Sequence, residues 1–110
     1  MNIDEIYLKI ANNIIDAIGS EWAIATINCK LAPNYGGFKC VYKEDISSIV
    51  DHDFDISFET FEAFEILHKI TTEDGASKWN RATFTLYSTG KSSTNFEWDQ
   101  ELADEIGATS

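Results

Sequence analysis

The sequence predicts an α+β fold, in which an antiparallel sheet of about four or five strands packs against an N-terminal helix and a central helix. Two segments repeat apolar residues at helical spacing, and the other segments alternate apolar and polar residues as strands do. The 110 residues, 44% of them hydrophobic, suffice for a single domain, 1–110, with a core of its own.

The N-terminal helix is expected over about Asn2 to Ile18. Asn2 is a favourable N-cap, and Gly19 is expected to end the helix in the left-handed conformation. Apolar residues recur three or four positions apart, at Ile3, Ile6, Tyr7, Ile10, Ile14 and Ile18. The helix is therefore amphipathic, with one broad face for the sheet.

A β-hairpin is expected next, with strands Trp22–Leu31 and Phe38–Lys43 around a turn at residues 33–37. Pairing Cys29 with Cys40 places the apolar side chains of both strands on one face and the lysines on the other. The two thiols then lie opposite each other. We interpret them as buried packing residues, and a redox pair or a metal-binding pair is the alternative.

A third strand is expected within Ile46–Asp55, and a central helix over Phe58–Ile70 with Ser57 as its cap. The helix repeats large apolar residues at Phe58, Phe61, Phe64, Leu67 and Ile70, with Ile66 beside them. Because its polar face is narrow, the sheet is expected to cover most of this helix.

A second hairpin is expected over Thr83–Trp98. A loop with an odd number of residues and Gly90 at positive φ would keep four large apolar side chains on one face, whereas a two-residue turn would separate them. We expect the odd-numbered loop. The four residues are Phe84, Leu86, Phe96 and Trp98. A short acidic helix, Asp99–Ile106, is expected to follow.

Acidic residues outnumber basic ones by 19 to 8, which gives a formal net charge of −11. The charge is uneven, because residues 44–74 hold ten acids and one base whereas residues 75–91 hold three bases and no acid. Such a field repels nucleic acids and anionic membranes, and it attracts cationic surfaces. The alternative is that the acid only keeps a small protein soluble.

The stretch Asp51–Glu62 is similar to a calcium-binding EF-hand loop, with acids at its positions 1, 3, 5, 9 and 12. Such a loop needs glycine at its sixth position for a sharp turn, and Ile56 stands there. An acidic strand end followed by a capped helix explains the same residues without an ion. We therefore expect no metal site.

No residue pattern points to catalysis or to a cofactor. His52 lies within the acidic run, and His68 is expected at the edge of the helix's apolar face, packed on Phe61 and Phe64. Both cysteines are placed in the core rather than in the accessible, cationic site that activates a thiol. Gly36–Gly37 lies in a hairpin turn without a following helix, unlike a phosphate-binding loop. We expect a binding protein rather than an enzyme.

The segment Trp79–Lys91 carries a recognisable motif, Trp-x-x-x-Thr-Phe-x-Leu-x-Ser-x-Gly-Lys, ahead of an acidic aromatic strand. This segment resembles the YezG-like immunity proteins, which are antitoxins of bacterial secreted or contact-dependent toxin systems. The helix around Ile6, the strand opened by Trp22 and the strand Phe38–Tyr42 follow in the same order as in that family. The resemblance spans about residues 3–100.

The resemblance implies a small cytoplasmic immunity protein that binds and neutralises a cognate toxin domain, commonly a nuclease, in a 1:1 complex. The charge agrees with this expectation, because nucleases present cationic clefts that an acidic protein complements. The alternative is an acidic adaptor or secretion chaperone with no toxin-neutralising role. Nucleic acid is not expected as a partner because of the negative charge. A membrane is not expected either, since no apolar run reaches the roughly 20 residues of a membrane span.

The toxin-facing surface is expected to use the acids of residues 44–74, because their density exceeds what solubility requires and a core cannot hold them. These acids are Asp51, Asp53, Asp55, Glu59, Glu62 and Glu65. Residues near the motif hairpin are expected to join them, with aromatic side chains supplying desolvated contact area. These are Tyr87, Glu97, Trp98, Asp99 and Glu101.

Overall fold

The computed structural model describes residues 2–19, 21–32, 35–73 and 78–109 of the chain. Within these ranges the fold is α+β, as predicted, with a five-stranded antiparallel sheet and three helices. The helices are α1 (Ile3–Ala17), α2 (Phe58–Thr72) and α3 (Gln100–Thr109). The strands are β1 (Ile24–Ala32), β2 (Tyr35–Lys43), β3 (His52–Asp53), β4 (Arg81–Tyr87) and β5 (Ser92–Glu97).

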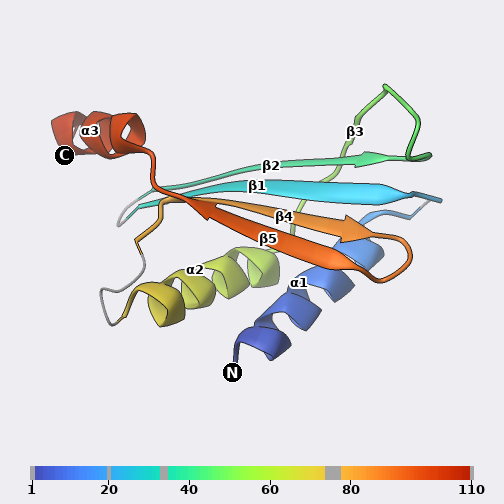
Figure 1. Ribbon diagram of the computed structural model, residues 1–110, viewed down its shortest axis with the longest axis horizontal. Coiled ribbons are helices and arrows are strands. Elements are labelled where there is room, and N and C mark those ends of the chain that lie inside the picture. Colours follow the sequence, from blue (N-terminus) through green and yellow to red (C-terminus); the bar gives the residue numbers. More distant parts are fainter. Residues whose placement is uncertain (1, 20, 33–34, 74–77, 110) are drawn as a thin grey trace.

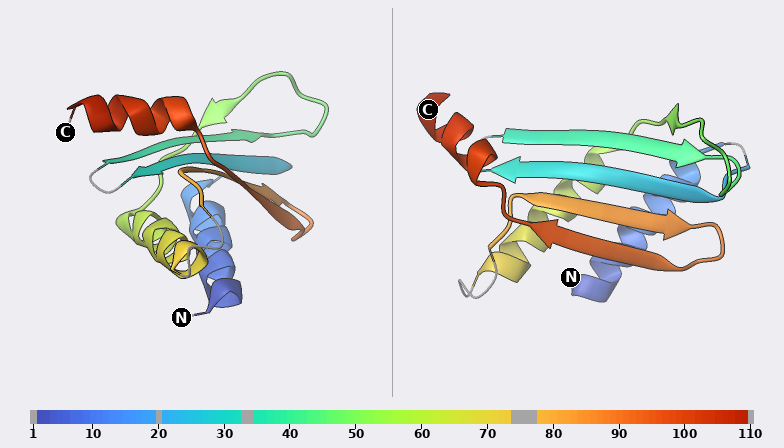
Figure 2. Two further views of the ribbon diagram at one scale, coloured as in Figure 1. Left: turned by 60° about the vertical axis from the view of Figure 1, so that its left-hand side comes forward. Right: turned by 45° about the horizontal axis from the view of Figure 1, so that its top comes forward.

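The sheet has the strand order β3-β2-β1-β4-β5, so β3 and β5 form opposite edges. Helices α1 and α2 lie side by side under one face of the sheet, and the other face is open (Figures 1 and 2). Helix α3 stands on the open side at one end of the strands (Figure 1). The core lies between the helices and the sheet, and its fully buried members include Ile6, Ile10, Ile14, Ile27, Phe64, Leu67 and Phe84.

Helix α1 begins and ends at the predicted places. Asn2 caps it, because its side-chain oxygen accepts a hydrogen bond of 2.8 Å from the Glu5 amide, and Glu5 reaches back to the Asn2 amide. The expected left-handed conformation of Gly19 is wrong. The chain leaves the helix through Ile18 in an extended conformation, so a left-handed residue is not needed there.

The predicted pairing of β1 with β2 is wrong by two residues. Cys29 lies opposite Phe38, and Cys40 lies opposite Ile27. The strands continue further toward their connection than expected, since Ala32 already pairs with Tyr35 and β2 includes part of the predicted turn. A shift of two keeps every side chain on its predicted face. The two cysteines are therefore diagonal neighbours, both free and buried. Residues 33–34 of the predicted turn lie outside the described residues.

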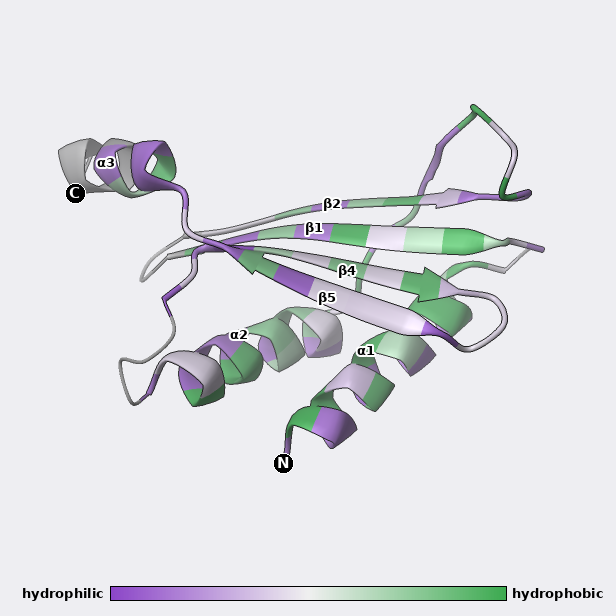
Figure 3. Cartoon of the chain, in the orientation of Figure 1, coloured by the Kyte–Doolittle hydropathy of each residue, from purple (hydrophilic) through white to green (hydrophobic). Residues whose placement is uncertain are grey.

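The connection between β4 and β5 is the predicted odd-numbered loop. The Tyr87 amide donates to the Lys91 carbonyl at 2.8 Å, and Gly90 between them has a φ of 97°. Phe96 therefore lies on the same side of the sheet as the buried Phe84, and its ring packs 4.8 Å from that of Trp79. Apart from its last residues, β5 is a hydrophilic strand (Figure 3).

Helix α2 is capped by Ser57, as predicted, but its buried face differs from the prediction. Phe58 is 73% exposed and Ile66 is 37% exposed. The smaller residues Thr60 and Ala63 are buried in their place, together with Phe64 and Leu67. The buried face of the helix is therefore shifted from the predicted one and includes two small residues.

His68 on α2 contacts Trp79, a partner that the sequence did not predict. Its Nε2 atom is 2.9 Å from the Trp79 carbonyl oxygen, and the two rings meet edge to face at 4.6 Å. The Trp79 indole N–H in turn donates to Thr71 at 2.7 Å. Trp79, the first residue of the sequence motif, thus connects the C-terminal part of α2 to the start of β4 through these contacts.

Candidate protein-binding site

The acids after residue 50 line one edge of the sheet. Asp51, Asp53 and Asp55 are exposed, whereas the residues between and after them, His52, Phe54 and Ile56, are half-buried. This alternation is typical of an extended edge strand, in which successive side chains point to opposite faces. The short β3 pairs there with the end of β2. The three carboxylates therefore face solvent.

Helix α2 follows along the chain with Glu59, Glu62 and Glu65, which are all exposed. We call the six acids Asp51, Asp53, Asp55, Glu59, Glu62 and Glu65 the acidic edge. Asp51 forms a long ion pair with Lys43, whose Nζ atom lies 3.9 Å from its Oδ1 atom. The other five make no ion pair with any residue that the structure describes. Their charge is available to a partner.

The acidic edge does not have the shape of an ion-binding loop. Its first three acids lie on extended chain and its last three on a helix. Over the described ranges, no group of three or more His, Cys, Asp or Glu side chains is placed to hold a metal ion. In the same ranges, no helix has both the length and the apolar character needed to cross a membrane.

Residues 44–51, which we call the apolar loop, connect β2 to β3 and are fixed by their own hydrogen bonds. The Asp45 carboxylate accepts from both the amide and the hydroxyl of Ser47 at 3.0 Å, and the Val50 amide donates to Ser48 Oγ at 3.1 Å. The bond from the Ser47 amide, followed by that from its hydroxyl, lowers the pKa of Asp45. At the base of the loop, His52 Nε2 lies 3.1 Å from Glu44 Oε1.

The apolar loop presents hydrophobic side chains to solvent directly beside the acidic edge. Ile49 is 94% exposed, Ile46 is 67% exposed and Val50 is 56% exposed. Exposed apolar clusters with a polar surround are typical of interaction surfaces. The sequence predicted a third strand within Ile46–Asp55, and β3 lies there, but the exposure of these three residues was not predicted. The available signal was three β-branched apolar residues without alternation among acids and serines.

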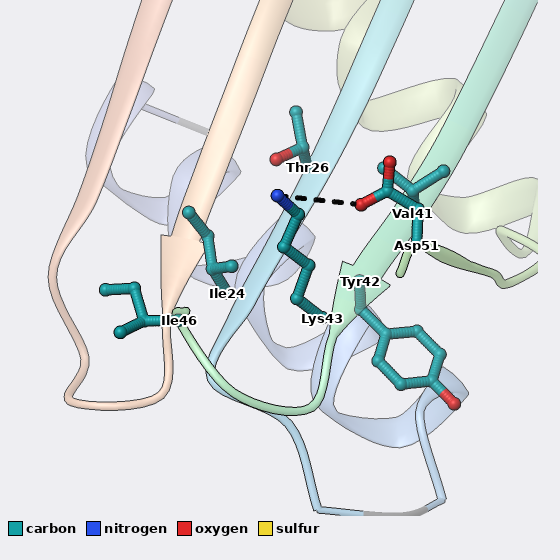
Figure 4. Close-up of a pocket in the computed structure, with 7 residues that line it drawn as sticks. All are labelled: Ile24, Thr26, Val41, Tyr42, Lys43, Ile46 and Asp51. Carbon is teal, nitrogen blue, oxygen red and sulfur yellow. Dashed lines mark ion pairs between the residues drawn. The ribbon is translucent and has the colours of Figure 1, made fainter. Parts of the chain in front are cut away.

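A hollow of about 150 Å³ lies on the open face of the sheet, beneath the apolar loop (Figure 4). Ile46 of the loop and Ile24 of β1 lie next to each other on one side, and the Lys43–Asp51 pair lies on the other. The remaining lining residues are Thr26, Val41 and Tyr42. The volume admits a single side chain, since a cavity of roughly 150 Å³ holds a benzene-sized group.

The second predicted group of site residues lies elsewhere. Glu97 and Trp98 are at the β5 edge, opposite the edge that β3 forms, and Glu101 is exposed on α3. Helix α3 and the apolar loop stand at opposite ends of the strands (Figure 1). Tyr87 is half-buried on β4, paired with Ile24, whose side chain lines the hollow. The structure therefore does not bring Glu97, Trp98 and Glu101 to the acidic edge.

Asp99 serves the attachment of α3. Its carboxylate accepts from the Leu102 amide at 3.2 Å and forms an ion pair with Arg81. These two contacts, in that order, lower its pKa. The buried Asn80 side chain holds the Asp99 main chain through bonds of 2.8 and 2.7 Å. Trp98 nearby carries Lys78 Nζ over its ring at 4.1 Å.

No protein-family model matches the chain, and no curated protein is significantly similar to it. The resemblance to YezG-like immunity proteins therefore stays a prediction from the sequence motif.

Proposed function

We propose that this protein is an immunity protein that binds a basic toxin domain through the acidic edge and the apolar loop, and thereby neutralises it. The observation that carries the proposal is the exposure of Ile49, which is 94% exposed in a loop held by its own hydrogen bonds and lies two residues before the first acid of the acidic edge. Apolar and acidic groups of this kind together suit a cationic protein surface that contains an apolar pocket.

The two parts of the surface have different physical roles. The side chains of Ile46, Ile49 and Val50 supply the apolar area whose removal from water stabilises a complex. The carboxylates mainly raise the association rate and select a basic partner. Because hydrogen bonds within the apolar loop already fix its shape, little conformational entropy is lost on binding.

A nuclease domain is the partner that this chemistry fits best, because its cleft must be cationic to bind a phosphate backbone. The carboxylates would occupy positions that the phosphates otherwise take. We expect one toxin domain per chain, bound at this surface. We place the complex in the cytoplasm, where a nuclease would meet cellular nucleic acid. In this role the protein acts by binding and not by catalysis.

The test begins with the adjacent genes, which on this proposal should include one for a secreted protein with a basic C-terminal domain. Its C-terminal domain is expressed in bacteria with and without this protein, and we expect growth to be restored only when both are present. A purified complex should also lack nuclease activity. An adaptor or secretion chaperone would bind the domain and leave that activity intact, which separates the two functions.

A single substitution tests the apolar loop. Ile49→Asp places a charge in the loop, and we expect a toxin affinity lower by about 2 kcal/mol, roughly 30-fold, as at the centre of an interface. The matched control is Ile15→Asp on α1, where the side chain is 51% exposed. Unchanged protection and affinity with Ile49→Asp would exclude the loop from the interface.

A further inference from the structure

Strand β5 is an edge of the sheet that nothing in the described structure covers. It pairs with β4 on one side, and its other side ends the sheet. Residues 92–96 are uncharged and contain no proline, although edge strands are usually guarded by charges, prolines or bulges. The strand is hydrophilic, so it stays soluble while its main chain remains open to pairing (Figure 3).

The free hydrogen-bonding groups of β5 belong to its even-numbered residues. The Lys91 carbonyl accepts from the Tyr87 amide, which places Lys91 in a hydrogen-bonded pair with β4. In an antiparallel ladder the direction of the main-chain groups alternates from one residue to the next. Ser92, Thr94 and Phe96 therefore direct both their N–H and C=O groups away from β4, toward the uncovered side.

The strand is complementary to a second copy of itself. If two β5 strands pair antiparallel with Thr94 on the two-fold axis, Ser92 of each copy pairs with Phe96 of the other, and six N–H···O=C bonds form. The same register places Lys91 opposite Glu97 of the second copy, twice by symmetry. These are non-hydrogen-bonded positions, at which cross-strand side chains approach most closely. We propose that this protein forms a homodimer through antiparallel pairing of β5 with β5.

The charge distribution favours this edge over the other. Between residues 78 and 97 the chain carries Lys78, Arg81 and Lys91 against Glu97 alone, so two copies with a net charge of −11 meet at their least acidic segment. The acidic edge lies at the opposite side of the sheet. A dimer through β5 would leave both acidic edges free at its far ends. The proposal is thus independent of what the acidic edge binds.

Sedimentation equilibrium of the full chain tests the dimer, whose mass should be twice 12.4 kDa. Lys91→Glu and Glu97→Lys each turn two attractive pairs into repulsive ones, and each should raise the dimer dissociation constant roughly tenfold or more. The double variant exchanges the charges and should restore the wild-type constant. Lys39→Glu is the matched control, because it makes the same charge change at an exposed position on β2.

Thr94→Pro provides a second test. It removes the outward-facing amide at the two-fold axis, which makes no bond to β4, so the monomer should keep its circular dichroism spectrum while the dimer is lost. A wild-type protein that stays monomeric at all concentrations would overturn the proposal. So would single charge variants that associate like wild type, or a double variant that fails to recover.

Discussion

Burial raises the pKa of Cys29 to about 12 and that of Cys40 to about 11, with the neighbouring Cys40 and Asp55 respectively as the smaller causes. Both groups are therefore protonated thiols at neutral pH, and a thiol reacts poorly. We expect iodoacetamide to modify neither cysteine in the native protein and both in denaturant, as measured by mass spectrometry. Fast modification of the native protein would show that one thiol is accessible.

The same pKa values predict how stability depends on alkaline pH. The unfolded chain loses its thiol protons near pH 9, whereas the folded protein keeps that of Cys29 to about pH 12. The stabilisation is thus complete below pH 9 and is lost as pH rises toward 12. Urea unfolding at increasing pH should show this decline, and Cys29→Ala should show a shallower one. Equal slopes for both proteins would contradict the assignment.

Gly36 marks a close approach between the sheet and α2. A Cβ atom at this position would lie 2.6 Å from Cε2 of Phe61, whose ring already packs 5.4 Å from that of Phe38. We expect Gly36→Ala to lower the free energy of unfolding by about 1–3 kcal/mol through overpacking. Gly19→Ala is the control, because nothing lies within 4 Å of its Cβ position. Equal midpoints in urea would show that Phe61 moves aside without cost.

At the scale of elements, the features that could be predicted from the sequence are those that depend on interactions between neighbouring residues. The capping residues Asn2 and Ser57 and the odd-numbered loop at Gly90 were all predictable, because each depends on a few adjacent residues. The register of β1 with β2 was not predictable in this way. A shift of two residues keeps every side chain on the same face, so only the length of the connection between the strands distinguishes the two registers. Phe58 was misassigned because spacing alone does not reveal which edge of an apolar stripe is covered.

The attachment of α3 depends on a joint formed by Asn80, Arg81 and Asp99 rather than on the main core. Among the residues of α3 whose side chains are described, Leu102 is buried, and it lies outside the core cluster. Asp99→Ala removes the cap and the ion pair, so we expect α3 to lose local stability. Hydrogen exchange should become faster in α3 and stay unchanged in β1. Asp104→Ala is the control, and equal protection in both variants would show that the joint is dispensable.

At the scale of the whole molecule, the sequence revealed the charge but not its arrangement. The acids Asp51, Asp53, Asp55, Glu59, Glu62 and Glu65 are all exposed. The strand order then places Glu97 and Trp98 at the other edge, and no local pattern contains that information. The exposure of Ile46, Ile49 and Val50 was equally hidden. An apolar residue is recognised as surface only when the packing of the complete fold leaves it without a neighbour.

The last prediction concerns the acidic edge as a source of long-range attraction. Neutralising Asp51, Asp53 and Asp55 together to Asn removes three exposed charges without emptying the core. Since such charges mainly act on the encounter, association with the toxin domain should slow by roughly tenfold at low salt. The decline of the rate with increasing salt should become shallower, and dissociation should change less.

The control for this prediction removes the same number of negative charges from another part of the surface, so both triple variants have the same net charge. Asp4→Asn, Asp16→Asn and Glu21→Gln together remove three exposed acids from around α1. If the whole-molecule charge governs the encounter, both triple variants will slow association equally, and the acidic edge is not special. If the local field governs it, only the variant at Asp51, Asp53 and Asp55 will lose the salt dependence, because at physiological ionic strength a field decays over about 8 Å. We expect the second result, since the acidic edge adjoins the loop that carries Ile49.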